Sequence, residues 1–322
     1  MRSVFIHINI FIICIIFSYR KVGALISFTY PSAISLMNGN FFIVEQNGIF
    51  VYDEQLTNII RNYSFKEEDK IANLDSLSNV IILYKRNYQN YIICLINGKI
   101  YFFDYEGKLL KETEKIITDE NYYHPTLTPI KLDDDYNSYY YIVGYYTYES
   151  SSYKIKLLYY KINLSDYSNN YITSFSLVEF TSSFWKDKYH FEGQGLSCEY
   201  LNAENYDQDT FLTCFFIINI DNKMALSHNF FGVTDSELSI NKKYYYDYIK
   251  NLNAVKQLKV VATNNRKNAL VCLLFTDQNL DCYKFRYTDG LLTDSASFYQ
   301  SLSTNFNCRN ELYGMKLNSR KM

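Results

Sequence analysis

Proline and glycine are scarce in this sequence. Average usage of about 5% Pro and about 7% Gly would place roughly 16 prolines and roughly 22 glycines in a chain of this length. The sequence holds 3 and 11. With so few of them, most turns of this chain cannot depend on proline or glycine. The turns must instead fall to Asn, Asp and Ser, whose short polar side chains hydrogen-bond the adjacent backbone.

Recognisable catalytic and metal-binding motifs are also missing. The sequence contains no HExxH, CxxC or GxSxG pattern. Beyond residue 24, His124, His190 and His228 do not have the spacing of zinc ligands. Residues 133–135 are three adjacent aspartates without the alternation of a calcium loop, and no carboxylate pair indicates a glycosidase. We therefore expect no enzyme, no metal and no cofactor, with a hydrolase of non-standard active site as the alternative.

No apolar stretch is long enough to cross a bilayer. Val4–Phe17 runs for about 14 residues, against the roughly 20 of a spanning helix. Arg2 before it and small residues after it give residues 1–24 the pattern of a cleaved signal peptide. Because Arg20 and Lys21 follow the apolar stretch, a retained signal anchor is the alternative. The sequence thus predicts entry into the secretory pathway and an extracellular or cell-surface location.

An excess of basic residues is absent as well. Without residues 1–24, 29 basic residues face 34 acidic ones, a net charge of −5. A mildly acidic surface argues against nucleic acid or an anionic membrane as the partner. We expect a protein or glycan ligand, and no membrane span in the mature chain unless the N-terminal segment is retained as an anchor.

Aromatic residues and a repeated hairpin are what the sequence does contain. Residues 90–111 alternate in polarity on both sides of Asn97-Gly98, which is a strong signal for a two-residue β-hairpin turn. Residues 40–53 repeat this pattern 50 positions earlier, with Asn47-Gly48 at the turn. A marker column, defined by the position of Cys94 in this hairpin, recurs along the chain. Its members are Val44, Cys94, Gly144, Cys214 and Cys272, at intervals of 50, 50, 70 and 58 residues.

A four-stranded unit recurring every 40–50 residues or somewhat more is typical of β-propeller blades. Helical solenoids have a similar period, but the 3.6-residue apolar spacing that they need is missing, and only residues 240–256 suit a helix or turn. We predict an all-β propeller domain over residues 25–305 with about five visible blades, beginning with a strand at 25–30 that ends at Pro31-Ser32. Residues 306–322 are either the start of a further blade or a C-terminal tail, so the ring is either closed or continued beyond the chain end.

Six cysteines follow the predicted leader, and an even number in a secreted chain suggests disulfides. Hairpin register places Cys272 opposite Cys282, and Cys198 opposite Cys214, so we predict these two bridges. Cys94 faces Tyr101 and is expected to be a buried thiol. The alternative for Cys94 is a bridge to Cys308, and the other alternative for Cys308 is a cysteine beyond a truncated chain end.

Two triplets fit the N-glycosylation acceptor pattern. They begin at Asn62 and Asn163, and both fall in segments expected to be loops. The presence and the absence of an N-linked glycan at these two residues are equal alternatives, because such triplets arise by chance in a chain rich in Asn.

The repeated units at residues 47–53 and 97–104 are similar to generic β-propeller blades. With its leader, aromatic-rich repeats and hairpin cysteines, the chain resembles uncharacterised secreted or surface proteins of AT-rich protists, apicomplexan parasites among them. This resemblance implies a secreted or surface-exposed binding module and no catalytic residues. The alternatives are the propeller hydrolase and a truncated gene product without a function of its own.

Overall fold

A computed structural model describes most of the chain between residues 32 and 298. The described residues are 32–35, 40–45, 47–55, 57–66, 70, 81–84, 90–104, 106–119, 122–132, 137–149, 152–181, 195–202, 210–220, 223–246, 249, 251–262, 268–275, 280–288, 291–292 and 297–298. The predicted leader, the predicted strand at 25–30 and the segment 306–322 lie outside these ranges.

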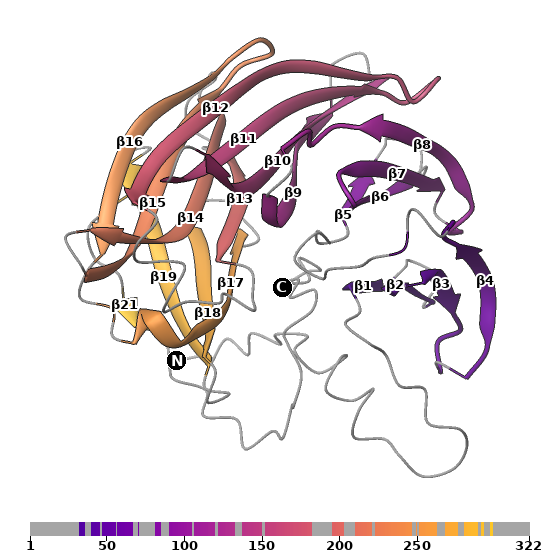
Figure 1. The fold of residues 1–322 in the computed structure, drawn as a ribbon, viewed down its shortest axis with the longest axis horizontal. Coiled ribbons are helices and arrows are strands. Elements are labelled where there is room, and N and C mark those ends of the chain that lie inside the picture. The colour runs from indigo at the N-terminus through magenta and orange to yellow at the C-terminus, as the bar shows by residue number, and fades with distance from the viewer. Residues whose placement is uncertain are drawn as a thin grey trace.

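The described strands form five antiparallel sheets in chain order, called blades one to five (Figure 1). Blade one holds β1 (Ser32–Ser35), β2 (Phe41–Glu45), β3 (Gly48–Tyr52) and β4 (Ile59–Ser64), and blade two holds β5 (Ile81–Tyr84), β6 (Asn90–Ile96), β7 (Lys99–Asp104) and β8 (Leu109–Lys115). Blade three holds β9 (Tyr122–Leu132), β10 (Ser138–Glu149), β11 (Ser152–Asn163) and β12 (Asn169–Thr181). In each, neighbours in sequence are neighbours in the sheet.

Blades four and five continue this order. Blade four holds β13 (Leu196–Asn202), β14 (Thr210–Ile220), β15 (Lys223–Val233) and β16 (Leu238–Tyr246). A 3-10 turn, η3 (Leu252–Ala254), leads into blade five, with β17 (Val255–Ala262), β18 (Asn268–Phe275) and β19 (Leu280–Thr288). The short strands β20 (Leu291–Leu292) and β21 (Ser297–Phe298) both pair with β19. The blades follow one another around an arc, with blades one and five at its two ends (Figure 1).

The hairpin at residues 90–111 confirms the predicted turn. Asn97 and Gly98 have φ values of 49° and 78°, so both central residues are left-handed, as a type I′ turn requires. The turn joins β6 to β7, and Cys94 faces Tyr101 across that hairpin. Each residue of the marker column lies in the second strand of its sheet, namely in β2, β6, β10, β14 and β18. The repeat was therefore read in the correct register.

Apolar side chains from neighbouring blades form four separate cores, one at each junction along the arc. Strand β14 illustrates the division, because successive side chains point to opposite faces of a sheet. Leu212 and Phe216 lie in the core shared with blade three, and Phe215 and Ile217 lie in the core shared with blade five. A sheet that is apolar on both faces needs a neighbour on each side, and the radial arrangement supplies it.

Some sequence-based expectations about local structure differ from the structure. Residues 240–256 were expected to suit a helix or turn between blades; β16 covers the first part and pairs with β15, whereas the 3-10 turn η3 at Leu252–Ala254 does lie between blades four and five. The first described strand covers Ser32–Ser35, and the strand expected at 25–30 stays a prediction outside the described residues. Asn62 lies within β4 instead of a loop, since it pairs with Phe50 of β3. For residues 240–246 and for Asn62, pairing with a partner strand decides the structure, which local sequence alone does not reveal.

Candidate functional site

The first strand of each blade lies nearest the middle of the arc (Figure 1). Strand β9 contacts β5 and β13, and β13 contacts β17, so the inner strands of blades two to five follow one another. Ligands of propellers and barrels meet such central surfaces or the loops at their ends. The inner strands are therefore the first place to look for convergent polar groups.

Hydrogen bonds tie these inner strands to their neighbours. The Thr128 hydroxyl donates to the carbonyl oxygen of Cys198 at 3.2 Å, which joins blades three and four. The Val260 amide donates to Ser197 Oγ at 3.0 Å, which joins blades four and five. Thr128 and Ser197 are both buried. Side-chain oxygens on the inner strands thus satisfy neighbouring backbone groups and hold the blades together.

On the inner strands, the Glu199 carboxylate of β13 interacts electrostatically with the Lys259 ammonium group of β17. Burial lowers the pKa of Lys259, and the nearby Glu199 carboxylate offsets part of that shift. Glu199 is also the one acidic residue within β1, β5, β9, β13 and β17. A retaining glycosidase needs two carboxyl groups about 5 Å apart, and these five strands supply one. Among the described residues there is also no cluster of three or more His, Cys, Asp or Glu that suits a metal ion.

His228 is buried in β15 and not at the centre of the arc. Its ring stacks on Phe215 with the ring centres 4.0 Å apart, and its Nε2 lies 2.5 Å from the Thr213 hydroxyl. Burial lowers the pKa of His228 to about 3, so the ring is neutral at pH 7. This histidine packs between blades four and five. The side chains of His124 and His190 lie outside the described part of the chain, although the backbone of His124 belongs to β9 and not to a loop.

A recurrent polar turn joins the third and fourth strands of blades one to four. In each, an oxygen-bearing side chain follows or ends the third strand, and its own backbone amide donates to a carbonyl across the turn. These residues are Asp53, Asp104, Asn163 and Thr234, whose amides reach Asn58, Lys108, Ser168 and Glu237. Sequence reasoning missed this feature. Its signal was an Asp, Asn or Thr directly after an apolar strand in each repeat.

The side chain of the turn residue completes each turn. Asp53 Oδ1 accepts from the Thr57 amide at 2.7 Å, and its Oδ2 accepts from the Asn58 carboxamide at 2.7 Å. Desolvation alone would raise the pKa of Asp53, but the hydrogen bonds from Thr57 and Asn58 outweigh it and lower the pKa to about 2. Asp53 therefore remains ionised at neutral pH as a structural group of the turn.

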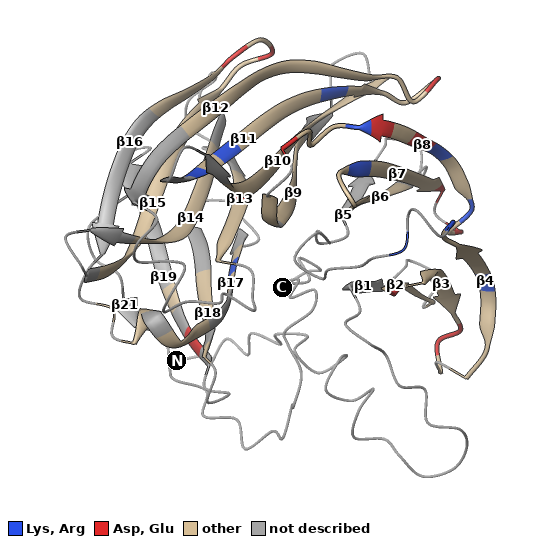
Figure 2. Cartoon of the chain, in the orientation of Figure 1, with Lys and Arg blue, Asp and Glu red and all other residues tan. Residues whose placement is uncertain are grey.

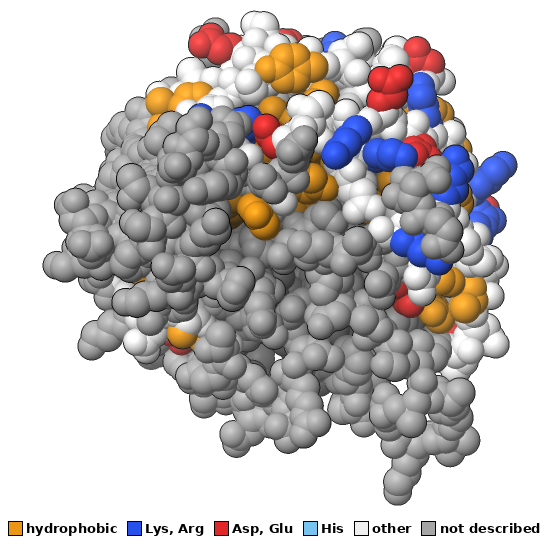
Figure 3. Space-filling model, in the orientation of Figure 1, with side chains coloured by type: hydrophobic (Ala, Val, Ile, Leu, Met, Phe, Trp, Pro, Cys, Tyr) orange, Lys and Arg blue, Asp and Glu red, His pale blue; other side chains and the backbone are white. Residues whose placement is uncertain are grey.

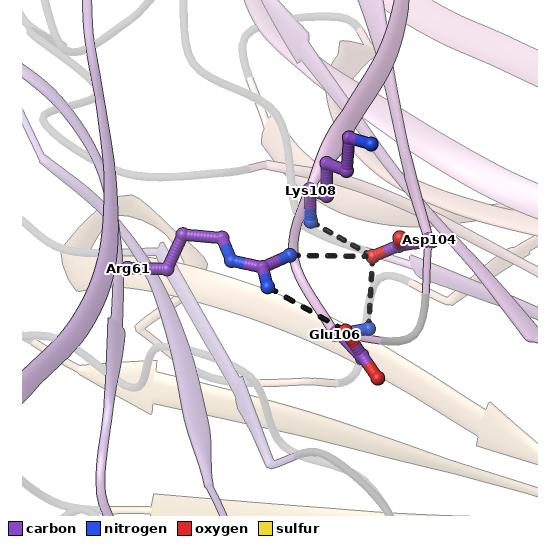
Figure 4. A network of polar contacts seen from close by, with 4 residues as sticks. All are labelled: Arg61, Asp104, Glu106 and Lys108. Atoms are coloured by element: carbon purple, nitrogen blue, oxygen red, sulfur yellow. Dashed lines mark hydrogen bonds and ion pairs between the residues drawn. The ribbon is translucent and has the colours of Figure 1, made fainter.

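Asp104 has a second role, because it also faces blade one (Figure 4). Its Oδ1 accepts from the amides of Glu106 and Lys108 at 3.0 and 2.8 Å. Arg61 of β4 approaches the same oxygen at 4.0 Å and reaches Glu106 Oε2 at 3.5 Å. The three charged side chains are between 28% and 51% exposed, so the ion pairs add little stability. They link β4 of blade one to the turn between β7 and β8 of blade two.

The outer surface mixes both signs of charge with a few exposed apolar groups. Strand β8 carries two lysines, Lys111 and Lys115, and two glutamates, Glu112 and Glu114 (Figure 2), and the space-filling view shows both signs side by side on this face (Figure 3). The exposed large apolar residues of the described part lie on fourth strands: Ile59 and Ile60 on β4, Tyr171 on β12 and Ile240 on β16. Among the described residues, the large apolar side chains that are most exposed therefore belong to the outermost strands of their blades.

The cysteines lie as the hairpin register indicated. Cys198 and Cys214 are opposite each other on β13 and β14 and share a disulfide. Cys272 is disulfide-bonded, and Cys282 is opposite it in the β18–β19 register. Cys94 is a buried free thiol, and burial raises its pKa. This geometry is compatible with both predicted pairings. Cys308 lies outside the described residues.

The two predicted glycosylation residues have different surroundings. Asn62 is exposed on β4. Asn163 is half-buried as the last residue of β11, and not in the loop that was expected. Asn163 Oδ1 accepts hydrogen bonds from the amide and hydroxyl of Ser165 at 2.9 and 2.6 Å.

Within the described ranges, no helix has the length and apolar character to span a membrane.

Comparison with known proteins identifies the fold. No protein-family model and no curated protein matches the chain. The chain is similar to the crystal structure of the Nup133 β-propeller domain of Vanderwaltozyma polyspora, with a TM-score of 0.52 and 11% identity over 77% of this chain and 68% of that one. It is also similar to AofleA from Arthrobotrys oligospora, with a TM-score of 0.46 and 9% identity over 85% of this chain and 73% of that one. The likeness to the Nup133 domain confirms the predicted β-propeller fold.

Proposed function

We propose that this chain is a secreted or surface-exposed propeller that acts as a binding module for a protein or glycan ligand. The observation that carries the proposal is the content of the inner strands. They hold one carboxylate, Glu199, beside Lys259, and their buried hydroxyls are used to join the blades. Such strands build a rigid scaffold. They do not contain the two carboxyl groups that acid–base hydrolysis of a glycoside needs.

Two further observations support the location. Residues 1–24 have the charge and length pattern of a secretory leader. The Cys198–Cys214 disulfide is of the kind that persists in oxidising compartments and is rare in the cytosol. A propeller in that setting presents its connecting loops to other molecules, because loops carry most binding residues on a rigid scaffold.

The test uses the full-length chain with its own leader, made in eukaryotic cells, beside the matched Glu199→Gln variant. Purified protein is applied to a printed glycan array and to intact cells, and both proteins are incubated with chromogenic aryl glycosides. We expect saturable binding that is equal for the two proteins, and no glycoside turnover. Turnover that disappears in Glu199→Gln would replace this proposal with the hydrolase alternative. Retention of the chain in the cytosol would refute the location.

A further inference from the structure

Strand β4 has one side chain row that points toward blade two and one that points away from it. Arg61 reaches Glu106 of blade two, and Tyr63 packs against the core shared with that blade. Asn62 pairs with Phe50, and Ile59 pairs with Tyr52. Directly paired residues of antiparallel strands share a face of the sheet. A register shift between Val51 and Tyr52 places Ile59, and not Ile60, opposite Tyr52. Because Phe50 and Tyr52 are two apart on β3 and share a face, Asn62 and Ile59 lie together on the face turned away from blade two.

This part of the rim is exposed and apolar. Ile59 and Ile60 are each 53% exposed, and Phe50, opposite Asn62, is half-buried. Strand β4 is the last strand in the order of its sheet and lies at the outer rim of the arc (Figure 1). An edge strand with exposed apolar side chains is a template for pairing with another chain, unless something covers it.

We propose that Asn62 carries an N-linked glycan, and that its first sugars lie over Phe50 and Ile59 and shield the open edge of β4. This inference rests on the proposed secretory location. The acceptor triplet is Asn62-Tyr63-Ser64, and both Asn62 and Ser64 are exposed. Since residues two apart on a strand share a face, the hydroxyl and the carboxamide are presented side by side.

The donor is an oligosaccharide carried on a polyisoprenyl pyrophosphate. Asn62 Nδ2 attacks the anomeric carbon of the first sugar, so that a C–N bond forms while the C–O bond to pyrophosphate breaks. One amide proton leaves, and the polyisoprenyl pyrophosphate is the leaving group. No electron transfer takes place. The sugar then lies next to the cross-strand neighbour of Asn62, the Phe50 ring, which offers an apolar surface.

The second acceptor triplet has a different structural task. Asn163 Oδ1 accepts from both the amide and the hydroxyl of Ser165, and the Asn163 amide donates to Ser168. Leu164, between them, is 3% exposed and belongs to the core of blades two and three. Asn163 thus closes the β11–β12 turn in the way that Asp104 closes the equivalent turn of blade two. The geometry assigns the glycan to Asn62 rather than to Asn163.

The site is tested with the full-length chain translated in the presence of microsomes. Protease protection reports whether the chain has been translocated, and treatment with peptide-N-glycosidase reports the glycan. We expect one mobility shift, lost in Asn62→Gln and Ser64→Ala but kept in Ser64→Thr and Asn163→Gln. Peptide mass spectrometry should find Asn62 converted to Asp after glycan removal. A shift that survives Asn62→Gln and disappears in Asn163→Gln would overturn the assignment.

The role of the glycan has a separate readout. Enzymatic removal from the purified chain should increase light scattering at constant concentration, and Ile60→Lys should prevent that increase by placing a charge on the edge. If the deglycosylated chain stays as monodisperse as the glycosylated one, the shielding role is wrong. A chain that is protected from protease but unmodified at Asn62 overturns this inference alone. A chain that is not translocated overturns the proposed location as well.

Discussion

His228 should make the stability of the protein depend on pH in a range where carboxylates remain ionised. The ring is fully buried, and burial lowers its pKa to about 3 from the ordinary 6.5. Below pH 6.5 the unfolded chain binds a proton at this position that the folded chain does not bind. Folding stability contributed by the neutral, buried ring is therefore present above pH 6.5 and is lost as the pH falls toward 3.

The size of the effect follows from the linkage relation. One proton of difference changes the free energy of unfolding by about 1.4 kcal/mol per pH unit. Between pH 6.5 and pH 5, His228 should therefore cost about 2 kcal/mol of stability. The variant His228→Phe keeps an aromatic ring next to Phe215 and removes the titrating group. Its stability should be nearly independent of pH over the same interval, relative to the original chain.

The measurement is urea unfolding of both proteins at pH 7.5, 6.5, 5.75 and 5, followed by tyrosine fluorescence. The difference in unfolding free energy between the variant and the original chain should grow in favour of the variant by about 2 kcal/mol from pH 6.5 to pH 5. Loss of the contact with Thr213 shifts the variant by a constant amount and leaves this slope unchanged. Parallel pH profiles would show that His228 is accessible to protons in the folded protein, and would refute the reasoning.

Four further substitutions test other parts of the fold. Asp104→Ala removes two accepted backbone hydrogen bonds and should lower the unfolding free energy by about 1–2 kcal/mol. Arg61→Ala should change the unfolding free energy by less than about 1 kcal/mol. Equal effects of the two substitutions in denaturant titrations would contradict the role of Asp104 in closing the turn. Cys94→Ser places a hydroxyl in the core between blades one and two and should cost about 1–3 kcal/mol, and the native thiol should not react with a thiol reagent until the chain unfolds. Tyr146→Phe removes a 2.8 Å hydrogen bond to the Gly195 carbonyl and should lower the unfolding free energy by about 1 kcal/mol; an unchanged thermal midpoint would count against that contact between blades three and four.

Local patterning was sufficient to predict most strands. Alternating residues on both sides of Asn97-Gly98 predicted a hairpin, and the φ values of that turn agree. The marker column placed Gly144 and Cys214 on the second strands of blades three and four, where β10 and β14 run. These predictions succeeded because the side chain period of a strand and the backbone preference of a turn are properties of a few adjacent residues.

Predictions failed where the partner strand determined the outcome. The segment beginning at residue 240 contains lysines and tyrosines that are compatible with helix or strand, and its pairing with β15 makes it a strand. Asn62 was expected in a loop because its segment is polar, but it lies in β4, the outermost strand of its sheet, whose side chains are exposed or half-buried. The candidate site was less predictable than the fold. The approach of Glu199 and Lys259 depends on two inner strands that are 60 residues apart in sequence.

The sequence by itself determined the structural repeat of this protein. It specified a four-stranded antiparallel sheet, the register of its second and third strands, and the pairs of cysteines that lie opposite each other, because all of these depend on contacts between neighbouring segments. The tertiary structure alone decided which side chains meet between the units. It placed His228 against Phe215, Arg61 beside Asp104, and Asn62 on an exposed rim. Those contacts depend on how whole sheets pack face to face. Such packing brings together residues that are far apart in the sequence, so the residues around each of them do not reveal the contact.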